Sequence, residues 1–285
     1  MVLALAAKRL DTRQVRCSGL IVVLTLIRLI GGDPARAGWR LLVFSETAGF
    51  RHDSIDEGQE LLAALGDLEG FTTTESEDST VFSASGLAPF RAVVFLNTTG
   101  DILTAAEEAA LDCFVRSGGG WVGVHAAADT EHAWPGYGAI LGGDAWFASH
   151  PAIQGATLER ESATHPSTAH YPATFTFTDE WYNFAANPRP AVTVLLTIDE
   201  SSYLPGPGAM GSDHPLSWAH AIGAGRGWYT NLGHRAETYA DPGFATHLLG
   251  GVAWAADCDQ QSCVEELVFR DGFEAGSACR WAPAP

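Results

Sequence analysis

Short apolar runs alternate with longer segments of helical spacing in the first half of this 285-residue chain. Residues 39–45, 92–96 and 121–124 are almost continuously apolar, which is typical of strands that are buried on both faces of a sheet. Between them, residues 54–65 and 104–115 repeat apolar side chains at helical spacing. Strands that alternate with helices predict a doubly wound α/β domain with a mostly parallel sheet.

The second of these helical segments also carries signals at its ends. Thr104 is followed three residues later by Glu107, which indicates a capping box, and three glycines from Gly118 end the helix. After residue 150 the pattern is less regular. It predicts strands at residues 174–178, 192–198 and 227–231, and a closing helix at residues 242–255.

The predicted sheet indicates where functional side chains should lie. In doubly wound folds, ligands bind beyond the carboxyl ends of the parallel strands. The loops that begin at Ser45, Asn97, His125 and Asn231 are therefore expected to share one rim of the domain.

Charge and lysine content exclude several classes of function. The chain has 16 Lys and Arg against 34 Asp and Glu, a formal net charge of −18, so it lacks the basic surface that nucleic-acid binding needs. Lys8 is the only lysine and lies in a predicted leader, so the mature chain has no amine for pyridoxal phosphate (PLP) or for a phosphate-binding loop. The Gly-x-Gly of residues 223–225 precedes a strand and opens no helix, so no NAD or nucleotide site is predicted.

The first 37 residues have the composition of a signal peptide. Four basic residues precede an apolar run at residues 19–30, and Ala35-Arg36-Ala37 matches a small-x-small cleavage site. The alternative is a retained anchor, but the run is short and contains Arg28. We expect a secreted or periplasmic protein without stable membrane insertion after cleavage, with a main domain at residues 38–257 and an appendix at residues 258–285.

Cysteine positions agree with an exported protein. Cys258, Cys263 and Cys279 lie in the appendix, where one disulfide of undetermined pairing is expected in an oxidising compartment. Cys113 falls in a helical pattern and is expected to be a small buried apolar side chain.

Histidines and carboxylates gather in the predicted rim loops. His125 follows an apolar strand among small residues, a setting that resembles a nucleophile elbow. His52 precedes a helix start, although Asp53 or Ser54 there can also be a plain helix cap. The other candidates in these loops are His150, His234, Asp129, Glu180 and Glu237.

Several of these segments together resemble one protein family. AGFRHDSI, GVHAAADT, FASHP, DEWYNF, HPLSWAH and GRGWYTNLGH are similar, in this order, to the motifs of the ThuA-like (trehalose utilisation) domain. The resemblance covers roughly residues 39–255. It implies a flavodoxin-like sheet, similar to that of the class I glutamine amidotransferases, and an association with carbohydrate metabolism.

The amidotransferase comparison also implies what the chain does not do. Those enzymes use a cysteine at the elbow and a His-x-Glu pair after a later strand, whereas this chain has His125 at the elbow and His234 with Glu237 at the later strand end. Imidazole does not replace a thiolate as acyl acceptor in that chemistry, and Cys113 lies in a helix. Glutamine hydrolysis by this route is therefore excluded.

Two chemical schemes remain open for the rim. Either a divalent metal such as zinc binds there, or histidine and carboxylate act as metal-free acid and base. The expected metal ligands are His52, His125, His150 and His234. The catalytic candidates are His125, His234, Glu237 and Asp129. The substrate-binding candidates are Arg51, His52, Glu180, Trp181, Trp218 and Arg226.

The expected function is that of an exported enzyme, a hydrolase or lyase, which binds a small carbohydrate and processes a sugar or glycoside. One alternative is a non-catalytic carbohydrate-binding module on the same fold, holding a sugar through Trp181, Tyr182 and Trp218. Another is an interaction domain in which the histidines are incidental. The mutual distance of the four imidazoles discriminates among them, because convergence within about 5–6 Å favours metal binding or catalysis.

Overall fold

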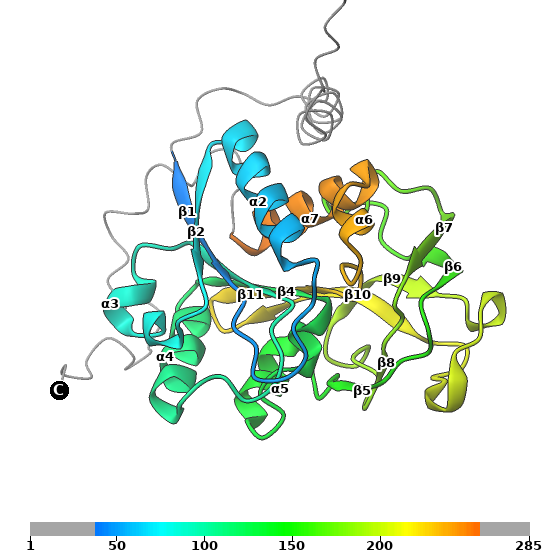
Figure 1. Cartoon of the computed structure of the whole chain (residues 1–285), viewed down its shortest axis with the longest axis horizontal. Coiled ribbons are helices and arrows are strands. Elements are labelled where there is room, and N and C mark those ends of the chain that lie inside the picture. Colours follow the sequence, from blue (N-terminus) through cyan, green and yellow to red (C-terminus); the bar gives the residue numbers. More distant parts are fainter. Residues whose placement is uncertain (1–37, 257–285) are drawn as a thin grey trace, which may run out of the picture. The chain divides into compact units, whose positions relative to one another are not determined.

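The computed structural model describes residues 38–256, drawn in colour in Figure 1. The predicted signal peptide and the appendix with its expected disulfide lie outside these residues. Within the described range, no helix is both long and apolar enough to cross a bilayer. Cys113 is half-buried, whereas a fully buried side chain was expected. Leu111 and Val115 form the buried side of its helix, and Cys113, two residues from each, points away from that side.

The parallel half of the main sheet confirms the predicted α/β fold. Its strand order is β2-β1-β3-β4-β11, and every neighbouring pair is parallel. All residues of β3 and β4 are buried, as expected for strands covered on both faces. The bounds are Trp39–Phe44 (β1), Phe71–Ser76 (β2), Ala92–Leu96 (β3), Gly120–Val124 (β4) and Gly225–Thr230 (β11).

An antiparallel half extends the sheet beyond β11, in the order β10-β9-β6-β7. The hydrophobic pattern indicated β7 and β9, but not β6 or β10, because the polar and small side chains of those two strands interrupt the alternation that marks a strand. A separate two-stranded sheet joins β5 to β8. The bounds are Phe147–Ser149 (β5), Gln154–Arg160 (β6), Thr174–Asp179 (β7), Asn183–Phe184 (β8), Thr193–Ile198 (β9) and Pro215–Ile222 (β10).

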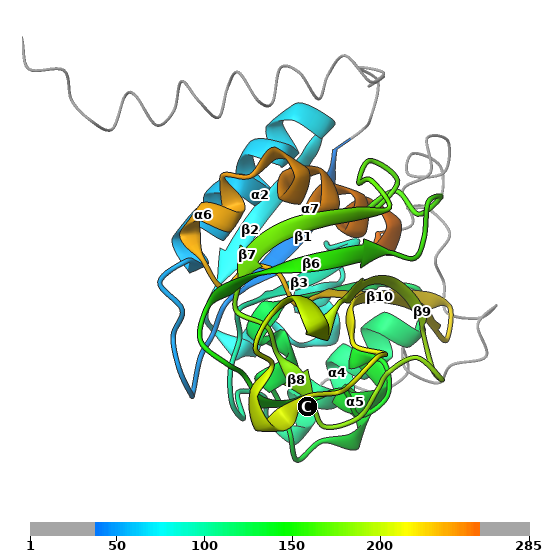
Figure 2. The same ribbon diagram turned by 90° about the vertical axis from the view of Figure 1, so that its right-hand side faces the viewer.

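Helices cover both faces of the parallel half (Figures 1 and 2). On one face lie α2 (Ile55–Glu69), α6 (Ala236–Tyr239) and α7 (Pro242–Ala255). On the other lie α3 (Ala84–Leu87), α4 (Ala105–Arg116) and α5 (Pro135–Leu141). Four short 3₁₀ helices complete the described part of the chain: η2 (Ser79–Val81), η3 (His125–Asp129), η4 (Glu200–Ser202) and η5 (Gly206–Gly208).

The starts of two helices show how local sequence is used differently. At α4 the predicted capping box is confirmed, with the Glu107 carboxylate accepting the backbone N–H of Thr104 at 2.7 Å. At α2 the hydroxyl of Ser54 makes no helix cap and donates instead to the carbonyl of Gly233 at 3.1 Å. Ser54 therefore ties the start of α2 to the loop after β11.

The carboxyl ends of β1, β3, β4 and β11 meet at one edge of the sheet, so their loops share a rim as predicted. Asn97, the first residue after β3, is fully buried in this rim. Its amide donates to the carbonyl of Gly233 at 3.1 Å and to the hydroxyl of Ser54 at 3.2 Å. These bonds fix three rim loops against one another.

Candidate metal centre

Four side chains converge at this rim: His52, His125, His234 and Glu180. The ring centroid of His52 lies 5.0 Å from that of His125 and 5.0 Å from that of His234, and the last two are 5.2 Å apart. One nitrogen from each ring and one Glu180 oxygen lie within 4.8 Å of one another. The four residues come from the loop before α2, the start of η3, the loop after β11 and the loop after β7.

The backbone at His125 aims its imidazole into this cluster. Its φ of 46° lies in the left-handed region, which residues other than glycine seldom adopt. The next three residues are fully buried alanines, and the Tyr229 hydroxyl donates to the His125 carbonyl at 2.8 Å. The small neighbours and this bond hold the turn, which is the elbow-like setting that the sequence suggested.

The protonation of His125 follows from its partner. Its Nδ1 lies 2.6 Å from the carbonyl oxygen of Asn231, and a carbonyl only accepts, so Nδ1 carries the proton. The other nitrogen, Nε2, then presents a lone pair. It is 3.5 Å from a Glu180 oxygen and has no hydrogen-bond partner. A carbonyl that orients a histidine in this way is a common outer-shell feature of metal sites.

Two further buried ring nitrogens in the cluster make no hydrogen bond, namely Nδ1 of His52 and Nδ1 of His234, the second of which lies 3.4 Å from a Glu180 oxygen. Buried polar atoms in folded proteins are nearly always hydrogen-bonded, so three unpartnered nitrogens around one carboxylate need an explanation. A divalent cation would satisfy all of them. Three imidazoles and one carboxylate, or three of these with an open position, form a ligand set of the kind that zinc uses.

The charge states in the cluster also suit a cation. Burial, and then the neighbouring imidazoles, lower the pKa of His52 to about 2, and the same causes lower the pKa of His234. Burial alone would raise the pKa of Glu180, but the close imidazoles of His125, His234 and His150 outweigh burial and lower the pKa of this carboxyl. Neutral imidazoles and an ionised carboxylate are the forms that bind a metal ion.

His150, the fourth expected ligand, lies on the outer side of Glu180. Its Nδ1 is 3.0 Å from the second carboxylate oxygen, and its side chain is 43% exposed. The structure thus brings together three of the four expected histidines, with Glu180 completing the compact group and His150 beside it. Glu180 was expected to contact substrate, and the structure places its carboxylate among the three imidazoles of the cluster.

The remaining charged candidates lie outside the cluster. Asp129 pairs with His132 at 2.9 Å, Arg51 pairs with Glu77 at 2.7 Å, and both pairs are partly exposed. Arg226 stands near the start of β11, at the opposite end of that strand from the rim, where it donates to the carbonyl of Trp254 at 3.0 Å.

Glu237 also lies outside the cluster, in the first turn of α6. It pairs with Arg235 at 3.2 Å, and its side chain is 72% exposed. The geometry of the described residues therefore does not place it with His234 in a catalytic pair.

The two tryptophans expected to contact a sugar are core residues. Trp181 and Trp218 are fully buried. Their indole N–H groups donate to the carbonyls of Gln154 at 2.9 Å and Leu141 at 2.6 Å. Neither ring presents a face to solvent, because each fills the interior between the sheet and its neighbouring segments.

Two residues that support the cluster had no role assigned from the sequence. Asn231 supplies the carbonyl for His125, and its side-chain oxygen accepts the backbone N–H of Tyr182 at 3.2 Å. Asp179, fully buried, accepts from the backbone N–H of Gly233 and from the Thr238 hydroxyl, both at 2.9 Å. Asp179 is the last residue of β7, and Asn231 directly follows β11. Because residues at strand ends lie at the rim in this fold, their positions could have been used to predict them.

Comparisons with known proteins identify related folds. The sequence model of ThuA, described as trehalose utilisation, matches residues 40–255. A ThuA-like protein from Bacteroides uniformis ATCC 8492 is 26% identical, with 80% of this chain and 97% of that one covered and a TM-score of 0.68. Another, from Parabacteroides merdae ATCC 43184, is 21% identical, with 77% and 90% covered and a TM-score of 0.62.

A more distant similarity concerns the fold alone. A β-galactosidase from Bacillus circulans sp. alkalophilus is 14% identical, with 78% of this chain but 31% of that one covered and a TM-score of 0.51. Among curated protein sequences, none matches this chain significantly.

Proposed function

Because this chain belongs to the ThuA family, described as trehalose utilisation, we propose that it is a metal-dependent enzyme that acts on a sugar or a glycoside. The observation that carries the proposal is the set of three buried, unpartnered imidazole nitrogens around Glu180. Such a set leaves buried polar atoms unsatisfied unless a cation binds, and a fold has no structural need for it. The proposal includes export, as the pattern of residues 1–37 predicts.

The residues of the cluster have separate tasks in this proposal. His52, His125, His234 and Glu180 would hold the ion, and Asn231 fixes the ring of His125. A bound divalent ion supplies Lewis acidity toward a sugar oxygen or activates a water molecule. His150 contacts Glu180 from the solvent side, and we assign to it the exchange of a proton with substrate.

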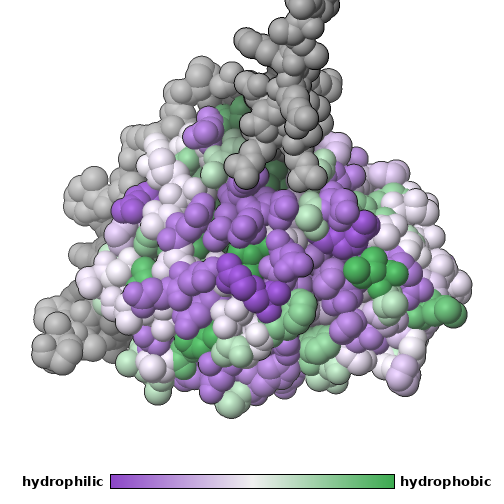
Figure 3. All heavy atoms as spheres, viewed as in Figure 1, coloured by the Kyte–Doolittle hydropathy of each residue, from purple (hydrophilic) through white to green (hydrophobic). Residues whose placement is uncertain are grey.

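The alternative of a sugar-binding module without turnover has less support. The aromatic residues on which it depends, Trp181, Tyr182 and Trp218, are all at most 3% exposed. An interaction domain has little support as well. On the face shown in Figure 3, hydrophilic residues predominate and hydrophobic ones form small separate patches.

Metal analysis of the wild-type protein tests the proposal. We expect one divalent ion per chain after purification with added zinc, manganese or iron, measured by mass spectrometry. Turnover of a panel of sugars and glycosides should disappear on treatment with a chelator and return when the ion is restored. Turnover that survives complete removal of metal would reject the metal-dependent mechanism.

An exposed aromatic ring at the cluster suggests how substrate is held. Phe50 is 67% exposed, and its ring centroid lies 4.9 Å from that of His52. The Thr99 hydroxyl donates a hydrogen bond to the Phe50 carbonyl at 2.9 Å, which fixes this part of the loop. Sugar rings pack their C–H faces against such aromatic faces.

We therefore expect Phe50→Ala to raise KM about 10-fold with little change in kcat, and Phe50→Tyr to retain the wild-type KM. Steady-state kinetics on any substrate found in the panel measures both. Metal content should be the same in wild type and variants. An unchanged KM in Phe50→Ala would show that substrate does not contact this ring.

A further inference from the structure

Three carboxylates gather where the loop after β3, the first turns of α4 and the segment after η3 meet. Asp101, Glu108 and Glu131 each contribute one oxygen, and these oxygens lie within 4.8 Å of one another. None of the three residues belongs to the candidate metal centre, and we call them the acidic cluster. Negative charges at such distances repel one another unless a proton or a cation lies between them.

Glu131 distinguishes the acidic cluster from ordinary surface acids, because it is fully buried. Buried carboxylates in proteins are nearly always paired or coordinate a metal ion. Its Oε1 accepts the backbone N–H groups of Ile102 and Leu103, both at 2.7 Å. Its second oxygen, Oε2, is buried as well and accepts no hydrogen bond. The fold therefore fixes this carboxylate and leaves one of its oxygens without a donor, which a bound cation would supply with a partner.

Backbone hydrogen bonds hold the two loops of the acidic cluster together. The N–H of Gly100 donates to the carbonyl of Asp129 at 2.7 Å, and the N–H of Glu131 donates to the carbonyl of Gly100 at 3.0 Å. These bonds join the segment after η3 to the loop after β3, directly beside Asp101. The Asp101 and Glu131 carboxylates thus lie on backbone that is already ordered, so a ligand shared by them has little chain to immobilise.

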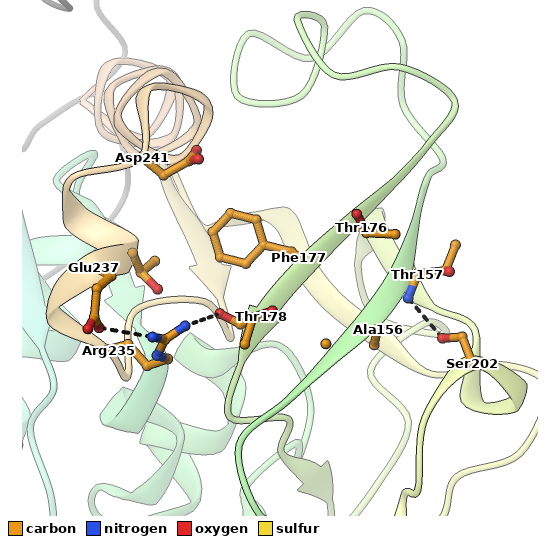
Figure 4. Close-up of a pocket in the computed structure, with 11 residues that line it drawn as sticks. Ala156, Thr157, Thr176, Phe177, Thr178, Ser202, Arg235, Glu237 and Asp241 are labelled. Atoms are coloured by element: carbon orange, nitrogen blue, oxygen red, sulfur yellow. Dashed lines mark hydrogen bonds and ion pairs between the residues drawn. The ribbon is translucent and has the colours of Figure 1, made fainter.

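No positive side chain neutralises the acidic cluster. In the described part of the chain, no arginine forms an ion pair with its carboxylates, and lysine is absent from that part. Figure 4 shows the contrasting case near the β6–β7 hairpin, where the Glu237 carboxylate is paired with the Arg235 guanidinium at 3.2 Å. Burial, and then the neighbouring Asp101 carboxylate, raise the pKa of Glu131, which agrees with charge that no partner offsets.

The donor atoms of the acidic cluster select the kind of cation. Carboxylate oxygens suit hard ions such as calcium and magnesium, whereas zinc favours the imidazoles of the candidate metal centre. Oxygens within 4.8 Å of one another fit around one ion at the calcium–oxygen distance of about 2.3–2.6 Å. Magnesium demands a tighter octahedral arrangement at about 2.1 Å and gives up its water reluctantly. Calcium is therefore the ion that this group fits best.

We propose that Asp101, Glu108 and Glu131 form a calcium site, separate from the candidate metal centre, with water molecules completing the coordination of the ion. A bound ion would tie the loop after β3, the start of α4 and the segment after η3 to one another, and so stabilise this part of the rim. The inference does not depend on the proposed function, because it uses none of the residues assigned there to metal binding or to proton transfer.

Calcium binding to the full chain, freed of metal by a chelator and dialysis, tests the inference. Calorimetric titration should show a site with a dissociation constant below about 1 mM, and saturating calcium should raise the thermal midpoint by at least about 3 °C. Magnesium at the same concentration should raise it by less than half as much. Glu131→Gln should abolish both effects of calcium, because glutamine still accepts the two backbone N–H groups but lacks the charge. Asp101→Asn should weaken calcium binding at least about 10-fold.

Control variants separate the calcium site from other acidic groups and from the candidate metal centre. Glu237→Gln, at an exposed carboxylate outside the acidic cluster, should bind calcium like wild type. His234→Ala should do so too, so a failure of the proposed function leaves this test intact. Should Glu131→Gln fail to fold, Glu108→Gln takes its place in the same measurements.

Three results would each overturn the inference. The first is the absence of any calcium-dependent shift in wild type, which would mean that a proton alone relieves the repulsion in the acidic cluster. The second is an equal shift with magnesium, which would indicate general charge screening. The third is a calcium response in Glu131→Gln as large as that of wild type.

Discussion

Replacing His234 with alanine is expected to lower metal affinity by more than about 100-fold and to abolish turnover. The substitution removes one of the three unpartnered imidazole nitrogens, and the remaining ligands cannot close around the ion in the same geometry. Glu180→Gln should act similarly, because it keeps the shape of the side chain but removes the negative charge. Metal titration monitored by calorimetry measures both effects.

The same variants distinguish a functional cluster from a structural one. His234 Nδ1 makes no hydrogen bond in the fold, so His234→Ala should leave the thermal midpoint of the metal-free protein within about 3 °C of wild type. His132→Ala, at a histidine paired with the partly exposed Asp129, is the matched control and should keep full metal binding. If His234→Ala strongly lowers the thermal midpoint of the metal-free protein and leaves the metal affinity unchanged, the cluster is structural and the enzymatic proposal is wrong.

The second large effect concerns stability in acid. His247 of α7 is fully buried, its Nδ1 lies 2.8 Å from the carbonyl of Ser167, and its Nε2 lies 3.0 Å from the Thr230 hydroxyl. The carbonyl requires a proton on Nδ1, so Nε2 accepts from the hydroxyl and the ring is neutral. Burial lowers the pKa of His247 to about 3, from about 6.5 for an exposed histidine.

The sign of the pH effect follows from this lowered pKa. Above the unfolded-state pKa of about 6.5 the ring is neutral in the folded and the unfolded chain, so its titration does not change the free energy of unfolding. As the pH falls toward the folded pKa, the unfolded chain takes up a proton that the folded chain does not, so the free energy of unfolding decreases. At pH 4.5 this histidine alone should lower the free energy of unfolding by about 3 kcal/mol relative to its value above pH 6.5.

His247→Gln isolates that contribution. Glutamine retains a donor and an acceptor but does not titrate, so the variant should be less stable than wild type at pH 7.5 and lose less stability on acidification. Urea unfolding between pH 7.5 and pH 4.5 measures the two slopes, with His132→Gln as a surface control that follows wild type. Parallel pH slopes for wild type and His247→Gln would contradict the prediction.

The site shows which signals a sequence carries and which it lacks. His125 and His234 each follow a strand of the parallel half directly or closely, and parallel strands end at one edge, so their proximity could be predicted. Trp181 and Trp218 were expected beside a sugar and are core residues instead. Tryptophan suits both settings, and the choice depends on which segments cover the ring.

Some strands of the sheet could also be predicted from the sequence, and others could not. Continuous apolar runs indicated β1, β3 and β4, because strands covered on both faces need apolar side chains at every position. The antiparallel half was only partly indicated. Strands such as β6 have exposed residues, and their order is fixed by long-range pairing that leaves no local pattern.

By itself, the sequence determined the α/β class, the placement of histidines at strand ends and the absence of a catalytic cysteine at the elbow. Those features depend on local periodicity and on residue identity, which the chain carries directly. Only the tertiary structure decided that Glu180 and not His150 completes the compact group, that Asn231 orients His125, and that Glu237 is exposed on α6 and outside the cluster. Each of these depends on distances of a few ångströms between segments far apart along the chain, which are set by packing and not by spacing.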